Sequence, residues 1–483
     1  MPAALEPPAG LARPCPPEAP LVGLAYLRAI IRNPLDAIPQ AAFERPMLHR
    51  RVLGRERLLV MAPELIERVL LTDAAAFAKS DTMRRALSPA LGEAILTADG
   101  ERWRRQRRAV APIFRPERQR AFLGPMLEAA ARTCDRWLAL PPGTEVELGH
   151  EMMRTTFDII VETMLSGQGA IDVARVEAGI TEYLASTGWA IALAILGAPA
   201  WTPHPGRRRA ARARDHLRAE LLRLVAERRR LGSGRDDLIA HLLAARDPES
   251  GAAMDDRDIA DNLLTFITAG HETTALALTW AFHLLAHYPA EEARLLDEIA
   301  AVTRGAPLRP ADISSLTRTR QTIQEVLRLY PPAPIIARTA QRATNLGGAA
   351  VEAGTTVLIP VIATHRHRAL WEEPDRFEPG RFTPEAVKAR HRHAWIPFGA
   401  GPRTCIGAGF AMDEATAILA TLLPAVALRP EPGFDPGLSM RITLRPARGM
   451  PMRVLPRRPA AAGEALAPAG ATPHHADDRR GFA

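Results

Sequence analysis

The sequence predicts a mainly α-helical fold with small β-sheets, built around one long central helix. A helical pattern runs from Asp256 to His287, with acidic residues at its start and Pro289 just after its end. At 1.5 Å per residue this helix would span roughly 48 Å, longer than most domains are wide. Shorter helical patterns fill much of the remaining chain, and no change in composition marks a second domain.

The two ends of the 483-residue chain differ in composition from the part between them. Residues 1–20 are rich in proline and lack the apolar core of a signal peptide or membrane anchor, so we expect a disordered lead there. Residues 457–483 are rich in alanine and proline, and we expect a disordered tail. The folded domain is therefore predicted over residues 21–456. Within it, three segments have the pattern of hairpins or short β units: 50–63, 351–366 and 440–455.

Bulk composition narrows the class of protein. The chain is 47% hydrophobic and 24% charged, an ordinary soluble composition, and no stretch reaches 18 uninterrupted apolar residues. Three widely spaced cysteines argue against a disulfide framework and favour a reducing compartment. We therefore expect a cytoplasmic protein with no stable membrane insertion.

The net charge of +8 and the runs Arg207–Arg209 and Arg228–Arg230 raise the question of nucleic-acid binding. Between these runs Leu217, Leu221 and Val225 recur at helical spacing, which predicts an amphipathic helix with a solvated basic face. Aromatic residues make up only 5% of the chain and none interleave with the arginines. We expect no nucleic-acid partner, whereas an acidic protein partner suits such a face.

The segment "FGAGPRTCIG", residues 398–407, places Cys405 in a glycine-rich turn directly before a helical pattern. A helix start favours a thiolate, and glycines allow the backbone to approach something large and flat. Arg403 could pair with an anionic group on that object. Three other interpretations fit these residues alone: an inert helix-capping cysteine, a nucleophile with a histidine base, or a zinc ligand, although no second cysteine has paired spacing.

The whole pattern, Phe398-x-x-Gly401-x-Arg403-x-Cys405-x-Gly407, resembles the haem-binding signature of the cytochromes P-450, which are haem-thiolate monooxygenases. The resemblance implies the cytochrome P-450 fold, with the long helix over a haem b (iron protoporphyrin IX). It makes Cys405 the ligand of the iron, to which thiolate donates electron density that favours O–O bond cleavage. It also places Phe398 beside the sulfur and Arg403 at a haem propionate.

A second motif lies midway along the long helix. "AGHETT", residues 269–274, resembles the family's oxygen-binding motif. By this resemblance, the small Ala269 and Gly270 leave room for O2, Thr273 steadies the bound oxygen, and Glu272 helps to relay protons from solvent. An ordinary helix with a surface glutamate is the alternative interpretation of these residues alone.

A third motif, "EVLRLYPPAP", puts Glu325 and Arg328 one helical turn apart. As an exposed pair they would contribute about 0.2–0.5 kcal/mol. They resemble instead the family's ExxR motif, a buried network completed by Arg381 of "PGRF". The family usually has glutamate where this chain has Gly380, so local capping there is expected to differ.

The remaining resemblances concern the haem propionates. Trp103 and Arg107 match a WxxxR motif in which both residues reach a propionate, and Arg338 matches a propionate-binding arginine. On sequence alone, an isolated tryptophan in a basic helix usually packs against the core. The motifs occur in the family's order between roughly residues 20 and 456.

The resemblance implies a monooxygenase that puts one atom of O2 into a small hydrophobic substrate by hydroxylation or epoxidation. No flavin or iron–sulfur pattern follows the haem motifs, so we expect electrons from a separate ferredoxin and its ferredoxin reductase, ultimately from NAD(P)H. We expect a monomer. Two alternatives remain open: a peroxide-driven haem oxidase or peroxygenase, and a non-catalytic haem-binding sensor.

Substrate contacts follow only by analogy with the family. Candidates are Leu264 on the long helix, Ile335 and Ile336 after "LYPPAP", and residues 82–91. The strongly apolar segment 183–201 is expected to form an access lid. Each of these residues would also suit core packing. Apolar contacts favour a fatty acid, a terpenoid or an aromatic compound as substrate.

Overall fold

The long helix predicted from the sequence is present with the predicted bounds. The computed structural model describes residues 10–165, 179, 186–199, 201–232 and 237–457. In it, α11 runs from Asp256 to His287, and the side chain of its N-cap, Asp255, accepts a hydrogen bond from the backbone N–H of Asp258 at 2.6 Å. Most of its side chains are buried. The helices that pack against it include α6 (Leu148–Leu165), α9 (Arg207–Leu231), α13 (Thr317–Leu329) and α16 (Ala408–Leu422).

The remaining described helices cover the ends and flanks of this bundle. They are α1 (Gly23–Arg32), α2 (Pro63–Glu67), α3 (Asp81–Leu91), α4 (Gly100–Val110), α5 (Pro116–Leu138), α8 (Thr187–Ile195), α10 (Leu238–Ala244), α12 (Pro289–Thr303), α14 (Val361–Thr364) and α15 (Pro384–Ala389). None of the helices in the described ranges is both long enough and apolar enough to cross a lipid bilayer.

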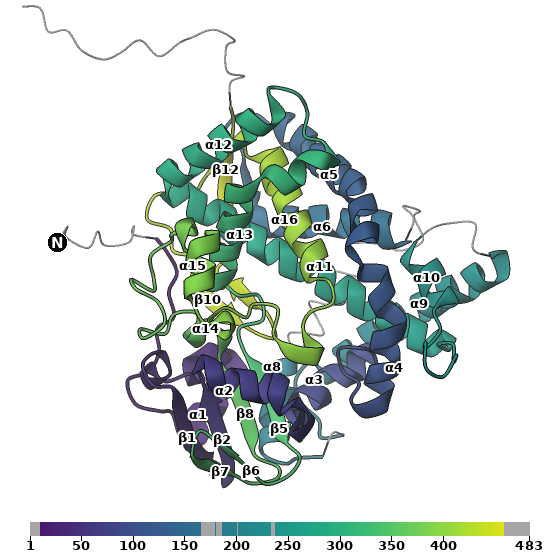
Figure 1. Cartoon of the computed structure of the whole chain (residues 1–483), viewed down its shortest axis with the longest axis vertical. Coiled ribbons are helices and arrows are strands. Elements are labelled where there is room, and N and C mark those ends of the chain that lie inside the picture. The colour runs from purple at the N-terminus through teal and green to yellow at the C-terminus, as the bar shows by residue number, and fades with distance from the viewer. Residues whose placement is uncertain (1–9, 166–178, 180–185, 200, 233–236, 458–483) are drawn as a thin grey trace, which may run out of the picture.

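A five-stranded sheet lies at the end of the molecule opposite to α12 (Figure 1). Its strand order is β1-β2-β8-β5-β3, and only the β2–β8 pair is parallel. The strands are β1 (Met47–Val52), β2 (Arg55–Val60), β3 (Phe77–Lys79), β5 (Ile336–Ala340) and β8 (Thr356–Ile359). The predicted hairpin over residues 50–63 is its β1–β2 edge, whose buried side chains share hydrophobic clusters with those of α1 and α2.

The other strands form three small sheets. They are β4 (Glu145–Glu147), β12 (Pro451–Pro456) and β9 (Val426–Arg429) in one sheet, β10 (Leu438–Met440) with β11 (Leu444–Pro446), and β6 (Thr344–Leu346) with β7 (Ala349–Val351). The hairpin predicted over residues 440–455 is therefore wrong in its pairing, because β11 pairs with β10 while β12 pairs with β4 and β9. Pro446 lacks the N–H that a longer ladder would need, and Met452 and Val454 are buried in the other sheet.

Residues 10–20 of the proline-rich lead lie against the folded domain. They form neither a helix nor a strand, and Ala12 is buried. The Tyr330 hydroxyl donates a hydrogen bond to the Ala12 carbonyl at 3.0 Å. Residues 1–9 and the tail from 458 lie outside the described residues.

The Glu325–Arg328 pair is fully buried on α13, not exposed. The guanidinium donates to both carboxylate oxygens of Glu325, at 2.6 and 2.8 Å. Its remaining N–H groups donate to the backbone carbonyls of His365, Pro374 and Arg376 at 2.6–2.9 Å. Arg328 thereby joins α13 to the loop that precedes Arg381. It also supplies hydrogen-bond donors to buried carbonyl groups, which would otherwise destabilise the fold.

Arg381 approaches the same carboxylate, as the sequence led us to expect. Its Nε lies 3.6 Å from Glu325 Oε1, within ion-pair distance. The backbone N–H of Glu378 also donates to Glu325 Oε1, at 2.9 Å, and the Glu378 side chain caps the turn at Gly380. The departure from the family's glutamate at residue 380 thus leaves the turn capped by a neighbouring side chain.

We predict that Arg328→Met destabilises the fold by about 3–5 kcal/mol, because it leaves the Glu325 charge and three carbonyls buried without their partner. Arg320→Ala is the matched control on the same helix, since its pair with Asp413 at 2.8 Å is partly exposed and should cost below about 1 kcal/mol. Thermal and urea unfolding of both variants measures the difference. Equal losses would contradict the structural role assigned to the buried network.

Candidate active site

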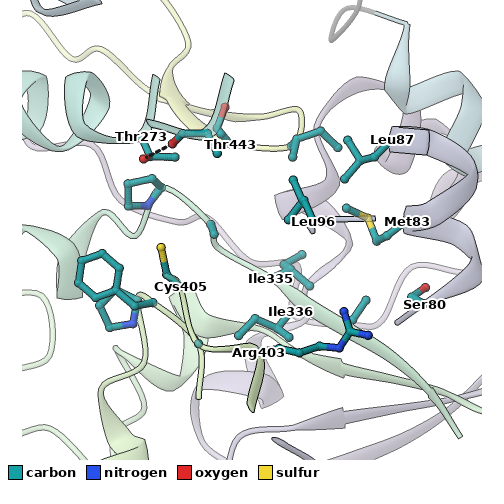
Figure 2. Close-up of a pocket in the computed structure, with 18 of the residues that line it drawn as sticks. Ser80, Met83, Leu87, Leu96, Thr273, Ile335, Ile336, Arg403, Cys405 and Thr443 are labelled. Carbon is teal, nitrogen blue, oxygen red and sulfur yellow. Dashed lines mark hydrogen bonds between the residues drawn. The ribbon is translucent and has the colours of Figure 1, made fainter. Parts of the chain in front are cut away.

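A cavity of about 550 Å³ lies between α11 and the Cys405 loop. Figure 2 shows the sulfur of Cys405 pointing into it, toward the side that bears Thr273 and Thr443, while Met83, Leu87 and Leu96 line another wall. Every residue predicted for cofactor binding or catalysis lines this cavity: Trp103, Arg107, Ala269, Gly270, Glu272, Thr273, Arg338, Phe398, Arg403, Cys405 and Gly407.

The loop that presents Cys405 has a tightly constrained backbone. Gly399 and Gly401 both have φ near +70°, a region that L side chains rarely adopt. A Cβ on Gly401 would lie 1.8 Å from the Leu70 carbonyl oxygen, so only glycine fits there. The backbone N–H of Cys405 donates to the Phe398 carbonyl at 2.9 Å, which closes the turn.

The Cys405 side chain is exposed, and the space that it faces is the cavity inside the protein. Burial raises the pKa of the thiol above its ordinary value, while the Gly407 backbone N–H and the Arg107 charge oppose that rise. A metal ion at the sulfur would remove the proton outright, because coordinated thiols are deprotonated. The sulfur is therefore suited to a metal inside the cavity.

Positive charge converges on one wall of the cavity, near Arg403. Arg403 forms an ion pair with Asp99 and stacks on Trp103, with its guanidinium carbon 4.2 Å from the ring centre. Arg107 and Arg338 also line the cavity, and burial lowers the pKa of both. A site with this many cations favours an anionic ligand, which is what the propionates of a haem would supply.

Lys79 is a member of this cluster that the sequence analysis missed. Lys79 on β3 lies opposite Arg338 on β5 in the strand register, and its ammonium group donates a hydrogen bond to the Leu96 carbonyl. Burial lowers its pKa to about 7, with further lowering by Arg338 and Arg403. No local pattern around residue 79 indicates this role, because the neighbour that reveals it lies more than 250 residues away in the sequence.

The opposite wall of the cavity is the middle of α11. The Thr273 hydroxyl donates to the Ala269 carbonyl one turn earlier at 2.8 Å, and Ala269 is exposed to the cavity. Gly270 also has a packing role that the sequence analysis did not predict. A Cβ there would lie 2.8 Å from Ile160 Cδ1, so its missing side chain allows α6 to pack closely, in addition to any room left for O2.

Glu272 is held by a pair of residues that the sequence analysis did not identify. It is buried and accepts hydrogen bonds from the Thr443 hydroxyl and from Arg445 Nη2, the latter at 2.5 Å. Arg445 Nε also donates to Thr443 at 3.1 Å, and the Arg445 side chain remains partly exposed. Glu272 therefore connects the cavity with the β10–β11 hairpin and, through Arg445, with the surface.

A second buried carboxyl lies behind α11. Glu414 of α16 is fully buried, and burial raises its pKa to about 8, while the neighbouring Thr274 hydroxyl opposes part of this rise. Glu414 is thus mainly protonated at neutral pH. Thr274 itself lines the cavity next to Thr273, so this acid adjoins the site through Thr274.

Most of the residues expected to contact the substrate line the cavity, with one exception. Ile335 and Ile336 line the cavity, as do Met83 and Leu87 from the predicted segment 82–91 and Ile191 and Ile195 from the predicted lid 183–201. Residues 183–185 and 200 of that lid lie outside the described part of the chain. Leu264 instead packs in the hydrophobic core. It is five residues before Ala269, about 140° around the helix axis, so it points away from the cavity.

Comparison with known proteins agrees with this geometry. The family model "Cytochrome P450" matches residues 14–450. Cyclooctatin synthase of Streptomyces melanosporofaciens is 33% identical, over 90% of this chain and 94% of the relative. Cyclooctat-9-en-7-ol 5-monooxygenase of the same organism is 34% identical, over 86% and 90% respectively. Pentalenene oxygenase of Streptomyces avermitilis is 31% identical, over 92% and 97%.

Among solved structures, a cytochrome P450DA heme domain superposes with a TM-score of 0.81 at 24% identity, covering 93% of this chain and 99% of that one. This likeness shows the fold. The family match over residues 14–450 and the relatives at 31–34% identity show that the chain belongs to the cytochrome P450 family and is a haem-dependent monooxygenase of hydrophobic substrates.

Proposed function

We propose that this monooxygenase hydroxylates or epoxidises a compact cyclic hydrocarbon or cyclic alcohol. The observation that carries the proposal is the Cys405 sulfur, which faces the Thr273 turn of α11 across a cavity with largely apolar walls. The names of relatives that act on cyclooctat-9-en-7-ol and pentalenene support a cyclic substrate over a linear one. When bound, haem supplies the reductive activation of O2, with one oxygen atom going to the substrate and the other to water.

The chain's own residues divide the remaining tasks. The Cys405 sulfur would hold the iron of a bound haem, and the cations at Lys79, Arg107, Arg338 and Arg403 would hold its propionates. Arg403 would then have to share or exchange its partner Asp99. Isoleucine and leucine side chains orient the substrate and exclude water, so that protons reach the site only through polar groups.

Proton supply is assigned to the polar groups around α11. The Thr273 hydroxyl, bonded to the Ala269 carbonyl at 2.8 Å, can turn to donate into the cavity. Glu272 reaches the surface through Arg445, with which it forms an ion pair. We infer that Arg445 is a positioning residue that holds the Glu272 carboxylate beside the cavity.

Electrons are proposed to come from a separate acidic ferredoxin and its reductase, with NAD(P)H as the source. Docking is supported by two arginines of α4, the helix that also carries Trp103 and Arg107: Arg104 is exposed and Arg105 is partly exposed. Both are partly compensated by carboxylates, Glu101 and Asp258, so the attraction is moderate. A monomeric, cytoplasmic protein is part of the same proposal.

Thr273→Ala should lower product formed per electron consumed by about tenfold, because it removes a proton donor from the cavity wall. Pentalenene serves as the first substrate probe, with binding checked by the change in haem absorption. Thr279→Ala is the matched control, since Thr279 makes the same bond to the carbonyl four residues earlier but does not line the cavity. Unchanged product per electron in Thr273→Ala would favour the peroxide-driven oxidase or the haem sensor.

The rate of reduction by an acidic ferredoxin should fall about tenfold as the ionic strength rises from low values to about 0.5 M, because salt screens the attraction between the two proteins. Stopped-flow measurement of haem reduction gives this rate. Arg104→Gln should flatten the salt dependence. A rate independent of ionic strength would contradict electrostatic docking.

A further inference from the structure

A cluster of two histidines and one glutamate lies away from the cavity, where α2 meets the short helix η8 (Arg392–Ala394). Glu67 is the last residue of α2, and His391 and His393 flank the start of η8. One ligand atom from each of the three lies within 4.8 Å of the other two. None of these residues lines the cavity or belongs to the motifs discussed above.

The donor atoms already have nearly the spacing of a metal site. Glu67 Oε2 lies 3.5 Å from His393 Nδ1 and 3.8 Å from His391 Nε2. Ligands about 2.1 Å from a tetrahedral zinc ion lie about 3.4 Å apart. The side chains of His391 and Glu67 are partly exposed, so a small rotation of His391 completes the triangle and leaves a fourth position open to water.

His393 supplies an independent indication of a ligand. Its side chain is 3% exposed, and within the described residues its Nδ1 has no hydrogen-bond partner. A buried nitrogen without a partner is costly, and a metal ion in this position would satisfy it.

We propose that Glu67, His391 and His393 bind a divalent transition-metal ion, with Zn²⁺ as the best-matched cation. Two imidazoles and one carboxylate suit zinc, whereas Mg²⁺ and Ca²⁺ prefer oxygen ligands. Binding through His391 Nε2 places the ring proton on Nδ1, so the contact in which Nδ1 accepts from the His393 backbone N–H at 3.2 Å is given up. The positive charge of the exposed Arg392, which lies between the histidines in the sequence, repels a cation. Only an ion that the three ligands coordinate tightly is therefore expected to bind.

The position of this site links it to the Cys405 loop. Two residues after His393, the Trp395 indole N–H donates a hydrogen bond to the Gln324 carbonyl at 3.2 Å. The chain then enters the Cys405 loop. On the other side, the segment η3 (Arg68–Thr72) that continues α2 contacts the loop at Gly401. A metal ion across Glu67 and His393 would therefore join α2 to the loop at a second point and stiffen it.

The test uses the haem-loaded, full-length protein, stripped of metal with a chelator and dialysed against ZnCl₂. Elemental analysis gives zinc bound per chain, and thermal unfolding gives the stabilisation by zinc. We expect one Zn²⁺ per chain and a higher unfolding midpoint with zinc. Glu67→Gln and His391→Asn should each weaken binding by about tenfold or more, with haem content unchanged. Because His393 is buried and its replacement could impair folding, the two more exposed ligands decide the question.

Two controls separate this site from incidental zinc binding. His49→Asn removes an exposed histidine whose Nε2 lies 2.7 Å from Glu56, a two-ligand pair that should not bind zinc tightly. The double variant His474→Ala, His475→Ala removes the paired histidines of the C-terminal tail. Both should bind zinc like the unmodified protein. No stoichiometric zinc, or equal binding in the Glu67 and His391 variants, would overturn the proposal.

Discussion

The approach of the Cys405 loop to the backbone around Leu70 is the constraint on which the active site depends. A side chain at Gly401 would collide with the Leu70 carbonyl, and the left-handed backbone at Gly399 and Gly401 turns the chain back so that Cys405 faces the cavity. Upstream, the Ile396 backbone N–H donates to His365 Nε2 at 2.8 Å. The His365 carbonyl in turn accepts a hydrogen bond from Arg328 Nη1. The buried ion pair on α13 and the cysteine loop are therefore connected through His365.

Two opposite walls of the cavity carry different charges and serve different tasks. One wall is suited to hold an anionic cofactor, and the other is suited to supply protons to the reaction. The wall beside Cys405 collects cations, of which Arg403 is paired with the Asp99 carboxylate, and so favours a dianionic ligand lying there. The wall formed by α11 carries hydroxyl and carboxyl groups, Thr273 and Glu272 among them, which can move protons. Between them the surfaces are mostly apolar, which strengthens both sets of interactions by excluding water.

Features encoded in short stretches of sequence could be predicted, and those that depend on distant pairing could not. The bounds of α11 followed from its acidic start and the proline after its end, and the residues around Cys405 followed from one dense motif. Lys79 required knowledge that β3 pairs with β5, and Arg445 required the register of the β10–β11 hairpin beside α11. Leu264 was misplaced because the rotation of a helix about its axis cannot be read from apolar residues when nearly every face is buried. The proline-rich residues 10–20 have a disordered composition but find partners in Tyr330 and His283.

The absorption spectrum of the reduced carbon monoxide complex tests the central claim most directly, because it reports the atom that ligates the haem iron. A Cys405 thiolate ligand predicts a main absorption band at clearly longer wavelength than that of a histidine-ligated globin, and Cys405→Ala should abolish this band while Cys134→Ala leaves it in place. A globin-like band in the unmodified protein, or no bound haem after loading, would contradict the account.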